Sequence, residues 1–134
     1  MSPGTDFFEL AQLCEQLRST TKRNVKSQLI ADLLHRLNEE EIAPAILLTI
    51  GSIFPERAEK ALDIGFQTIT KITTERKQTT LVQEPLTILD VDRYFSQIAE
   101  AAGPGSVEAK ETLLQSMLAR ASDLEAKWIM QMIF

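Results

Sequence analysis

The residues with the clearest capacity for chemistry are cations near the N-terminus. Residues 16–31 contain no acid, and this stretch carries Arg18, Lys22, Arg23 and Lys26. The whole chain has a formal net charge of −5, which taken alone argues against nucleic-acid binding. The distribution of charge matters more than the total, because a local basic surface binds phosphate even on an acidic protein. The stretch is therefore a candidate phosphate-binding surface.

Two breaks in the helical pattern, at 19–26 and 103–110, resemble phosphate-binding helix starts. Small or hydroxyl residues precede a helix N-terminus in each, and a lysine follows one turn later. Free N–H groups and the helix dipole favour phosphate there, and two such sites would hold DNA backbone without reading its sequence. The first is the stronger, because Glu108 and Glu111 flank Lys110, and an ordinary capped turn is the alternative for both. The candidate DNA-binding residues are Thr20, Thr21, Lys22, Arg23, Lys26, Gly103, Gly105, Ser106 and Lys110.

No catalytic or metal-binding constellation is visible in the sequence. There is no Walker loop, no dinucleotide-binding glycine pattern and no Ser/His/Asp set. The single cysteine, Cys14, lies among leucines at helical spacing and is expected to be buried. With His35 as the only histidine, a zinc site would need carboxylates as well. No apolar run is long enough to span a membrane and the start lacks a signal peptide, so a cytoplasmic protein with no membrane partner is expected.

The apolar periodicity is helical almost throughout, which predicts an all-α fold. The predicted helix 38–50 is apolar nearly all round from Ala43 to Ile50, so we expect it to be short, central and buried, with Gly51 ending it. Capping-box spacings are expected to start four of the helices, as Asp6/Glu9, Asn38/Glu41, Thr87/Asp90 and Ser122/Glu125. The predicted helices are 6–18, 25–37, 38–50, 55–62, 66–77, 87–102, 106–121 and 122 to the chain end.

An internal repeat relates the two halves of the chain. A shift of 84 positions brings Lys26 onto Lys110 and Glu41 onto Glu125, and the breaks, caps and apolar positions coincide. Chance similarity between amphipathic helices is the alternative. The repeat predicts two helical units related by a pseudo-twofold axis. Unit 1 is expected at about 6–77, a linker at 78–86 and unit 2 at about 87–134.

The repeat also bears on the end of the chain. Phe134 corresponds to Ile50, which precedes the expected helix stop at Gly51. The second unit reaches no such stop. We therefore expect unit 2 to be incomplete and the sequence to be a fragment of a longer protein.

Seven stretches of the sequence resemble the N-terminal DNA-binding domain of archaeal-type ATP-dependent DNA ligases. These stretches are Leu17–Arg23, Ile30–Leu34, Gly51–Glu56, Leu62–Gly65, Pro85–Thr87, Ile98–Ser106 and Leu124–Ile129. The resemblance spans nearly the whole chain, and the order and spacing of the motifs are more specific than any one of them. It implies an all-helical domain that binds nicked duplex DNA through the minor groove and backbone. Such a domain positions the nick for sealing in replication and repair.

The resemblance further implies a parent enzyme that seals nicks with ATP and Mg²⁺. Its lysine is adenylated within a K-x-D-G motif, which this sequence lacks. The nearest approach, Lys60–Gly65, has the wrong spacing. We therefore expect no catalytic residue, no cofactor and no ligase activity in the fragment itself.

Two partner questions stay open at the level of sequence. In archaeal relatives the linker can carry a sliding-clamp motif, glutamine followed by two aromatics. Here Gln78, Leu81 and Val82 keep the glutamine and apolar character without the aromatics, which argues against clamp binding. The alternative to DNA binding is a helical-repeat module for a protein partner, favoured by the charge of −5 and the 6% aromatic content.

Overall fold

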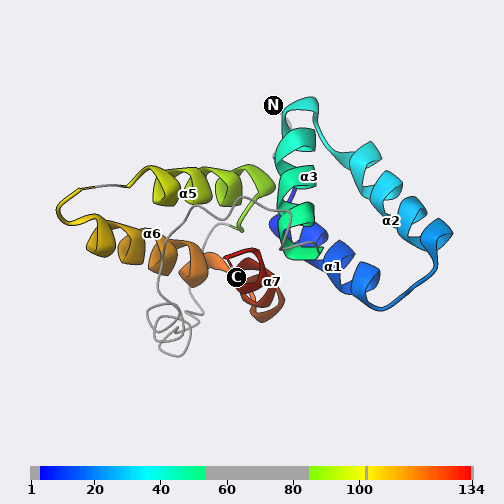
Figure 1. Ribbon diagram of the computed structural model, residues 1–134. Coiled ribbons are helices and arrows are strands. Elements are labelled where there is room, and N and C mark those ends of the chain that lie inside the picture. The colour runs from blue at the N-terminus through cyan, green and yellow to red at the C-terminus, as the bar shows by residue number, and fades with distance from the viewer. Residues whose placement is uncertain (1–3, 54–84, 102, 134) are drawn as a thin grey trace.

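The computed structural model describes residues 4–53, 85–101 and 103–133, which are mostly helical (Figure 1). Within these ranges the only β feature is an isolated bridge between Asp6 and Thr87, so the all-α prediction is confirmed. Also within these ranges, no helix has the length and apolarity needed to cross a membrane. The helices are α1 (Phe7–Arg18), α2 (Arg23–Arg36), α3 (Glu39–Ile53), α5 (Ile88–Glu100), α6 (Ser106–Arg120) and α7 (Asp123–Ile133).

Two of the predicted capping boxes are fully formed. At the start of α5, the Asp90 amide donates to Thr87 Oγ1 at 3.0 Å, and the Thr87 amide donates to Asp90 Oδ2 at 3.1 Å. At the start of α7, Ser122 and Glu125 form the same reciprocal pair at 2.9 and 3.3 Å. Each box satisfies two backbone donors of the first turn. The box expected at α1 is absent, because the N-cap residue Asp6 makes no side-chain capping bond.

A buried carboxylate holds the start of α3. Glu41 accepts hydrogen bonds from the Asn38 amide at 2.8 Å, the Thr5 amide at 2.6 Å and the Thr5 hydroxyl at 2.9 Å. Burial alone would raise the pKa of Glu41, but the bonds from Thr5 and Asn38 outweigh it and hold the pKa below its ordinary value. Glu125, its counterpart in the repeat, is also buried. The third helix of each half thus begins on a buried glutamate.

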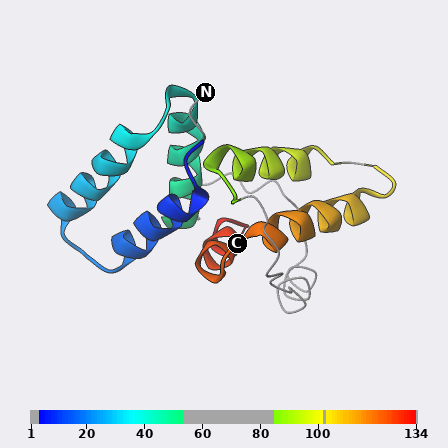
Figure 2. The same ribbon diagram turned by 180° about the vertical axis from the view of Figure 1, so that it is seen from behind.

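Most of the helix contacts follow the repeat. Within the halves, α1 packs on α2 and α5 packs on α6. Between the halves, α1 contacts α7 and α3 contacts α5, while α1 also meets α5 and α3 meets α7. The shift of 84 positions exchanges these contacts or maps them onto themselves, but the packing of α1 on α3 has no equally extensive counterpart between α5 and α7. In both views, α2 and α6 lie on opposite sides of the other helices (Figures 1 and 2).

Arginines at equivalent positions of the repeat form an ion pair within each half. Arg36 at the end of α2 pairs with Glu9 at 3.3 Å, and Arg120 at the end of α6 pairs with Asp90 at 2.8 Å. The side chains of the first pair are 54% and 40% exposed, against 19% and 16% in the second. Solvent screens an exposed pair more strongly, so the Arg120–Asp90 pair contributes more to stability.

One hydrophobic core joins both halves. It includes Phe7 and Leu10 of α1, Ile98 of α5, Leu114 of α6 and Trp128 of α7, all fully buried. The cysteine of α1 belongs to the same core, as predicted. Neither half encloses its own core, because α7 packs on both α1 and α3.

Several local predictions are wrong. Helix α3 is not shorter than its neighbours, since it has 15 residues against 14 in α2. It is not buried all round: Leu47 is 66% and Ile46 39% exposed, because only the side that carries Ala45 and Leu48 faces the core. Gly51 does not end the helix, because its backbone stays helical within α3. The N-cap of α6 is Gly105, one residue before the predicted Ser106.

Other predictions cannot be compared with the structure. The predicted helices 55–62 and 66–77 lie outside the described residues. So does the linker except for its last two residues, Pro85 and Leu86.

We expect Glu41→Gln to lower the free energy of unfolding by about 1–3 kcal/mol at neutral pH, because an amide cannot accept all three bonds. Since folding lowers the pKa of Glu41, its ionised form stabilises the protein fully above the ordinary value of 4.5. That contribution is lost as the pH falls through the folded value, so the difference between wild type and variant should narrow below pH 4.5. Urea unfolding at several pH values measures this difference in the free energy of unfolding.

Exposed Glu40 in the same turn gives the control for this experiment. Glu40→Gln should change the stability by no more than about 0.5 kcal/mol. If Glu41→Gln lowers the free energy of unfolding by the same amount at neutral and at acid pH, the role given to the ionised carboxylate is wrong.

We expect Gly105→Ala to cost about 1–2 kcal/mol, because Gly105 has φ +82° and an L side chain is strained there. A Cβ at this position would meet nothing within 4 Å, so strain is the only penalty. Gly105→Asn should cost less, since asparagine tolerates the left-handed region. Thermal unfolding compares the two variants, and an alanine variant as stable as wild type would refute the argument.

Candidate nucleic-acid interface

The two predicted phosphate-binding segments lie far apart. The α1–α2 connection is at one end of the molecule and the α5–α6 connection at the other, in both views (Figures 1 and 2). They do not form one pocket and cannot share one phosphate. Their placement suits only a long ligand that touches each end separately.

The start of α2 is open and carries no acid. Lys22 takes the N-cap position with an extended backbone, and its amide donates to Thr20 Oγ1 at 3.2 Å. The Lys22 side chain makes no capping bond, and the first turn of α2 contains no acidic residue. The first N–H groups of a helix have no partner within the helix. Those of α2 can therefore donate to an anion, beside the exposed side chains of Thr21, Lys22 and Arg23.

The cations of this segment lack carboxylate partners. Among the residues that the structure describes, neither Arg18 nor Lys22, Arg23 or Lys26 has a carboxylate within 4 Å. Four cations elsewhere in the described ranges, Arg36, Arg93, Arg120 and Lys127, each pair with a carboxylate. Within the described ranges, exposed positive charge without a carboxylate partner thus gathers at this segment. We call Arg18, Lys22, Arg23 and Lys26 the basic end.

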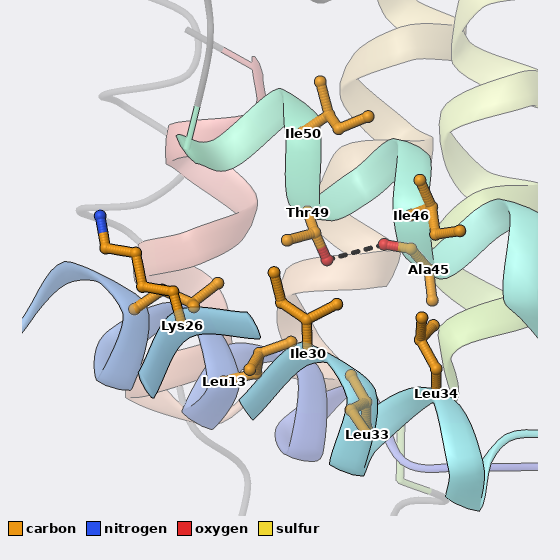
Figure 3. A pocket seen from close by; sticks show the side chains of 10 residues that line it. Leu13, Lys26, Ile30, Leu33, Leu34, Ala45, Ile46, Thr49 and Ile50 are labelled. Carbon is orange, nitrogen blue, oxygen red and sulfur yellow. Dashed lines mark hydrogen bonds between the residues drawn. The ribbon is translucent and has the colours of Figure 1, made fainter. Parts of the chain in front are cut away.

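Lys26 differs from the other members of the basic end because it is half-buried. Its side chain helps to line an apolar pocket of about 180 Å³ between α1, α2 and α3, with Leu13, Ile30 and Ile50 among its neighbours. Figure 3 shows its nitrogen directed away from these apolar side chains. The stem packs while the charge reaches outward, as is common for lysine.

The α5–α6 segment is a weaker phosphate site than the basic end. Gly103 and Gly105 have φ values of +83° and +82°, so both glycines are required by the turn itself. Ser106 donates its amide to the Gly103 carbonyl at 3.1 Å, which leaves one fewer free donor. Lys110 is only 9% exposed, and Glu108 lies in the first turn of α6. Its burial makes Lys110 a poor direct contact for a phosphate.

A cluster that sequence reasoning missed joins α7 to the basic end. Trp128 Nε1 donates to Glu15 Oε1 at 2.9 Å, and Lys127 Nζ bonds to the same oxygen. Arg18 and Lys127 lie 4.9 and 5.4 Å from the centroid of the Trp128 ring. The hydrogen bond from Lys127 holds the pKa of Glu15 below its ordinary value. No local signal reveals these contacts, because 113 positions separate Glu15 from Trp128.

The remaining predicted site residues lie elsewhere. Gln78, Leu81 and Val82, the residues considered for clamp binding, are outside the described residues. In the described ranges no three His, Cys, Asp or Glu side chains gather as they would around a metal ion.

Comparison with known proteins identifies relatives over nearly the whole chain. The family model described as DNA ligase N terminus matches residues 6–76 and 67–134. DNA ligase 1 of Korarchaeum cryptofilum is 32% identical over 145 residues, which cover 91% of this chain and 27% of that protein. A DNA ligase of Methanothermobacter thermautotrophicus is 26% identical, with 92% and 27% covered. A probable DNA ligase of Koribacter versatilis is 28% identical, with 92% and 26% covered.

These matches agree in extent. The chain spans about a quarter of the length of the relatives it matches. The family model covers well over half of the chain, and the all-helical fold agrees with it. The chain therefore belongs to the DNA ligase N-terminal domain family.

Proposed function

We propose that the chain binds duplex DNA at a nick without reading its sequence and positions the nick for sealing. The observation that carries this proposal is the basic end, whose four cations have no carboxylate within 4 Å among the described residues. Phosphates contacted by lysine and arginine release counterions, and this provides affinity for any sequence. The ligase relatives support DNA as the partner.

The geometry of α2 supports backbone contact rather than base readout. Its N-terminus, not its side, carries Thr21, Lys22 and Arg23. A helix that reads bases lies along the major groove and presents a row of side chains to base edges. A helix that points its N-terminus at the strand offers N–H groups and cations to phosphates instead. The second contact is the α5–α6 turn at the opposite end of the molecule.

The chemistry of ligation would need more than the residues of this sequence. In our proposal, the parent protein supplies the adenylated lysine, ATP and Mg²⁺ from other parts, and this chain contributes binding. Replication and repair are the processes that such an activity serves. Clamp binding through Gln78, Leu81 and Val82 is not part of this proposal, since the segment lacks the two aromatics of the clamp motif.

We expect Lys22→Ala with Arg23→Ala to weaken binding to a nicked duplex and to lower the slope of log K against log salt by about 1.8, since each phosphate contact contributes about 0.9. Lys26 is left unchanged, because it also packs in the apolar pocket. Fluorescence anisotropy of a labelled nicked duplex at several salt concentrations measures both quantities.

The control is Arg36→Ala with Arg93→Ala, which removes the same charge from side chains 54% and 56% exposed. Both arginines pair with carboxylates, so this variant should keep the wild-type slope. If both double variants lower the affinity and the salt slope equally, the binding depends on the net charge of the protein and not on the position of the basic end. Wild-type protein that shows no salt-dependent binding would refute the proposed function.

A further inference from the structure

Among the arginines that the structure describes, Arg18 lies over an aromatic ring without a carboxylate partner, whereas Arg93, which also lies over a ring, pairs with Asp90. Arg18 is the last residue of α1, it is exposed, and it adjoins the connection to α2. Its guanidinium lies 4.9 Å from the centroid of the fully buried Trp128 ring. An aromatic face attracts a cation without neutralising it. Arg18 is therefore fixed in place while its full positive charge remains.

Glu15 would ordinarily neutralise Arg18. The two residues are three positions apart on α1, a spacing at which opposite charges pair on a helix. Here Glu15 Oε1 instead accepts from both Trp128 Nε1 and Lys127 Nζ. No carboxylate of the described residues lies within 4 Å of the Arg18 guanidinium. Helix α7 thus engages, through two hydrogen bonds, the acid that α1 places near Arg18, and the Arg18 charge acts on Glu15 only from a distance, as the last of the causes that lower the Glu15 pKa.

We infer that Arg18 is a further contact for the DNA backbone and that Trp128 is the positioning residue that holds its guanidinium toward the phosphates. The inference rests on the proposed function and extends it. The phosphate-binding surface then reaches from the N-terminus of α2 across the end of α1 to α7, instead of ending at one loop. A planar guanidinium also binds a phosphate through two hydrogen bonds, which lysine cannot do.

The test uses the single tryptophan of the chain as a reporter. A nicked duplex is titrated into wild type and Arg18→Ala, with anisotropy of the labelled duplex and tryptophan emission measured together. Arg18→Ala should lower the salt slope by about 0.9, so that its loss of affinity is about 3.5-fold greater at 50 mM than at 200 mM salt. Wild-type emission should change on binding as Arg18 engages phosphate, and the variant should lose that change.

Two further variants make the test specific. Arg93→Ala removes an exposed arginine 6.0 Å from the centroid of the Tyr94 ring on α5, and it should keep both the slope and the emission change. Arg18→Lys keeps the charge but not the planar group, so it should keep the slope and bind several-fold more weakly than wild type. Arg18→Lys that binds as tightly as wild type would overturn the two-bond contact of the guanidinium with phosphate, and wild-type emission that does not change on binding would overturn the role of Trp128.

The inference and the proposed function fail in different ways. If Arg18→Ala keeps the wild-type slope and emission change while the Lys22/Arg23 double variant loses affinity, the inference is wrong and the proposed function stands. If wild type shows no salt-dependent binding, both are wrong.

Discussion

Glu15 and Trp128 meet across 113 positions of the chain, and much of the structure depends on that contact. The hydrogen bond satisfies the indole N–H of a fully buried ring, which would otherwise be costly to bury. It fixes α7 against α1, and α7 also packs on α3. The same contact engages Glu15, the carboxylate three positions before Arg18 on α1. One hydrogen bond therefore allows Trp128 to be buried in the core and also engages the acid beside the basic end.

Capping boxes at helix starts are predicted from the sequence more successfully than the tertiary packing around each helix. The boxes at Thr87/Asp90 and Ser122/Glu125 form as predicted, because a capping box depends on residues only three positions apart. The fold class follows from helical periodicity for the same reason. Local spacing also points to the basic end, since the absence of acids around it is visible in the chain itself.

Properties that depend on distant neighbours are not predicted. The apolar run of α3 suggests burial on all sides, yet Leu47 is 66% exposed because the other helices cover only one side. Gly51 suggests a stop, but a glycine ends a helix only where the backbone turns left-handed, and here it stays helical. Lys110 matches Lys26 in the repeat but is 9% exposed. The partners of Glu15 are likewise set by tertiary packing.

The central claim is that the N-terminus of α2 and the cations around it touch the DNA backbone. Amide chemical shifts, followed by NMR while a nicked duplex is added at low salt, test it most directly. The largest shifts should fall on residues 20–26, and the Trp128 indole N–H should also respond. DNA binding that leaves these signals in place and moves others would contradict this claim.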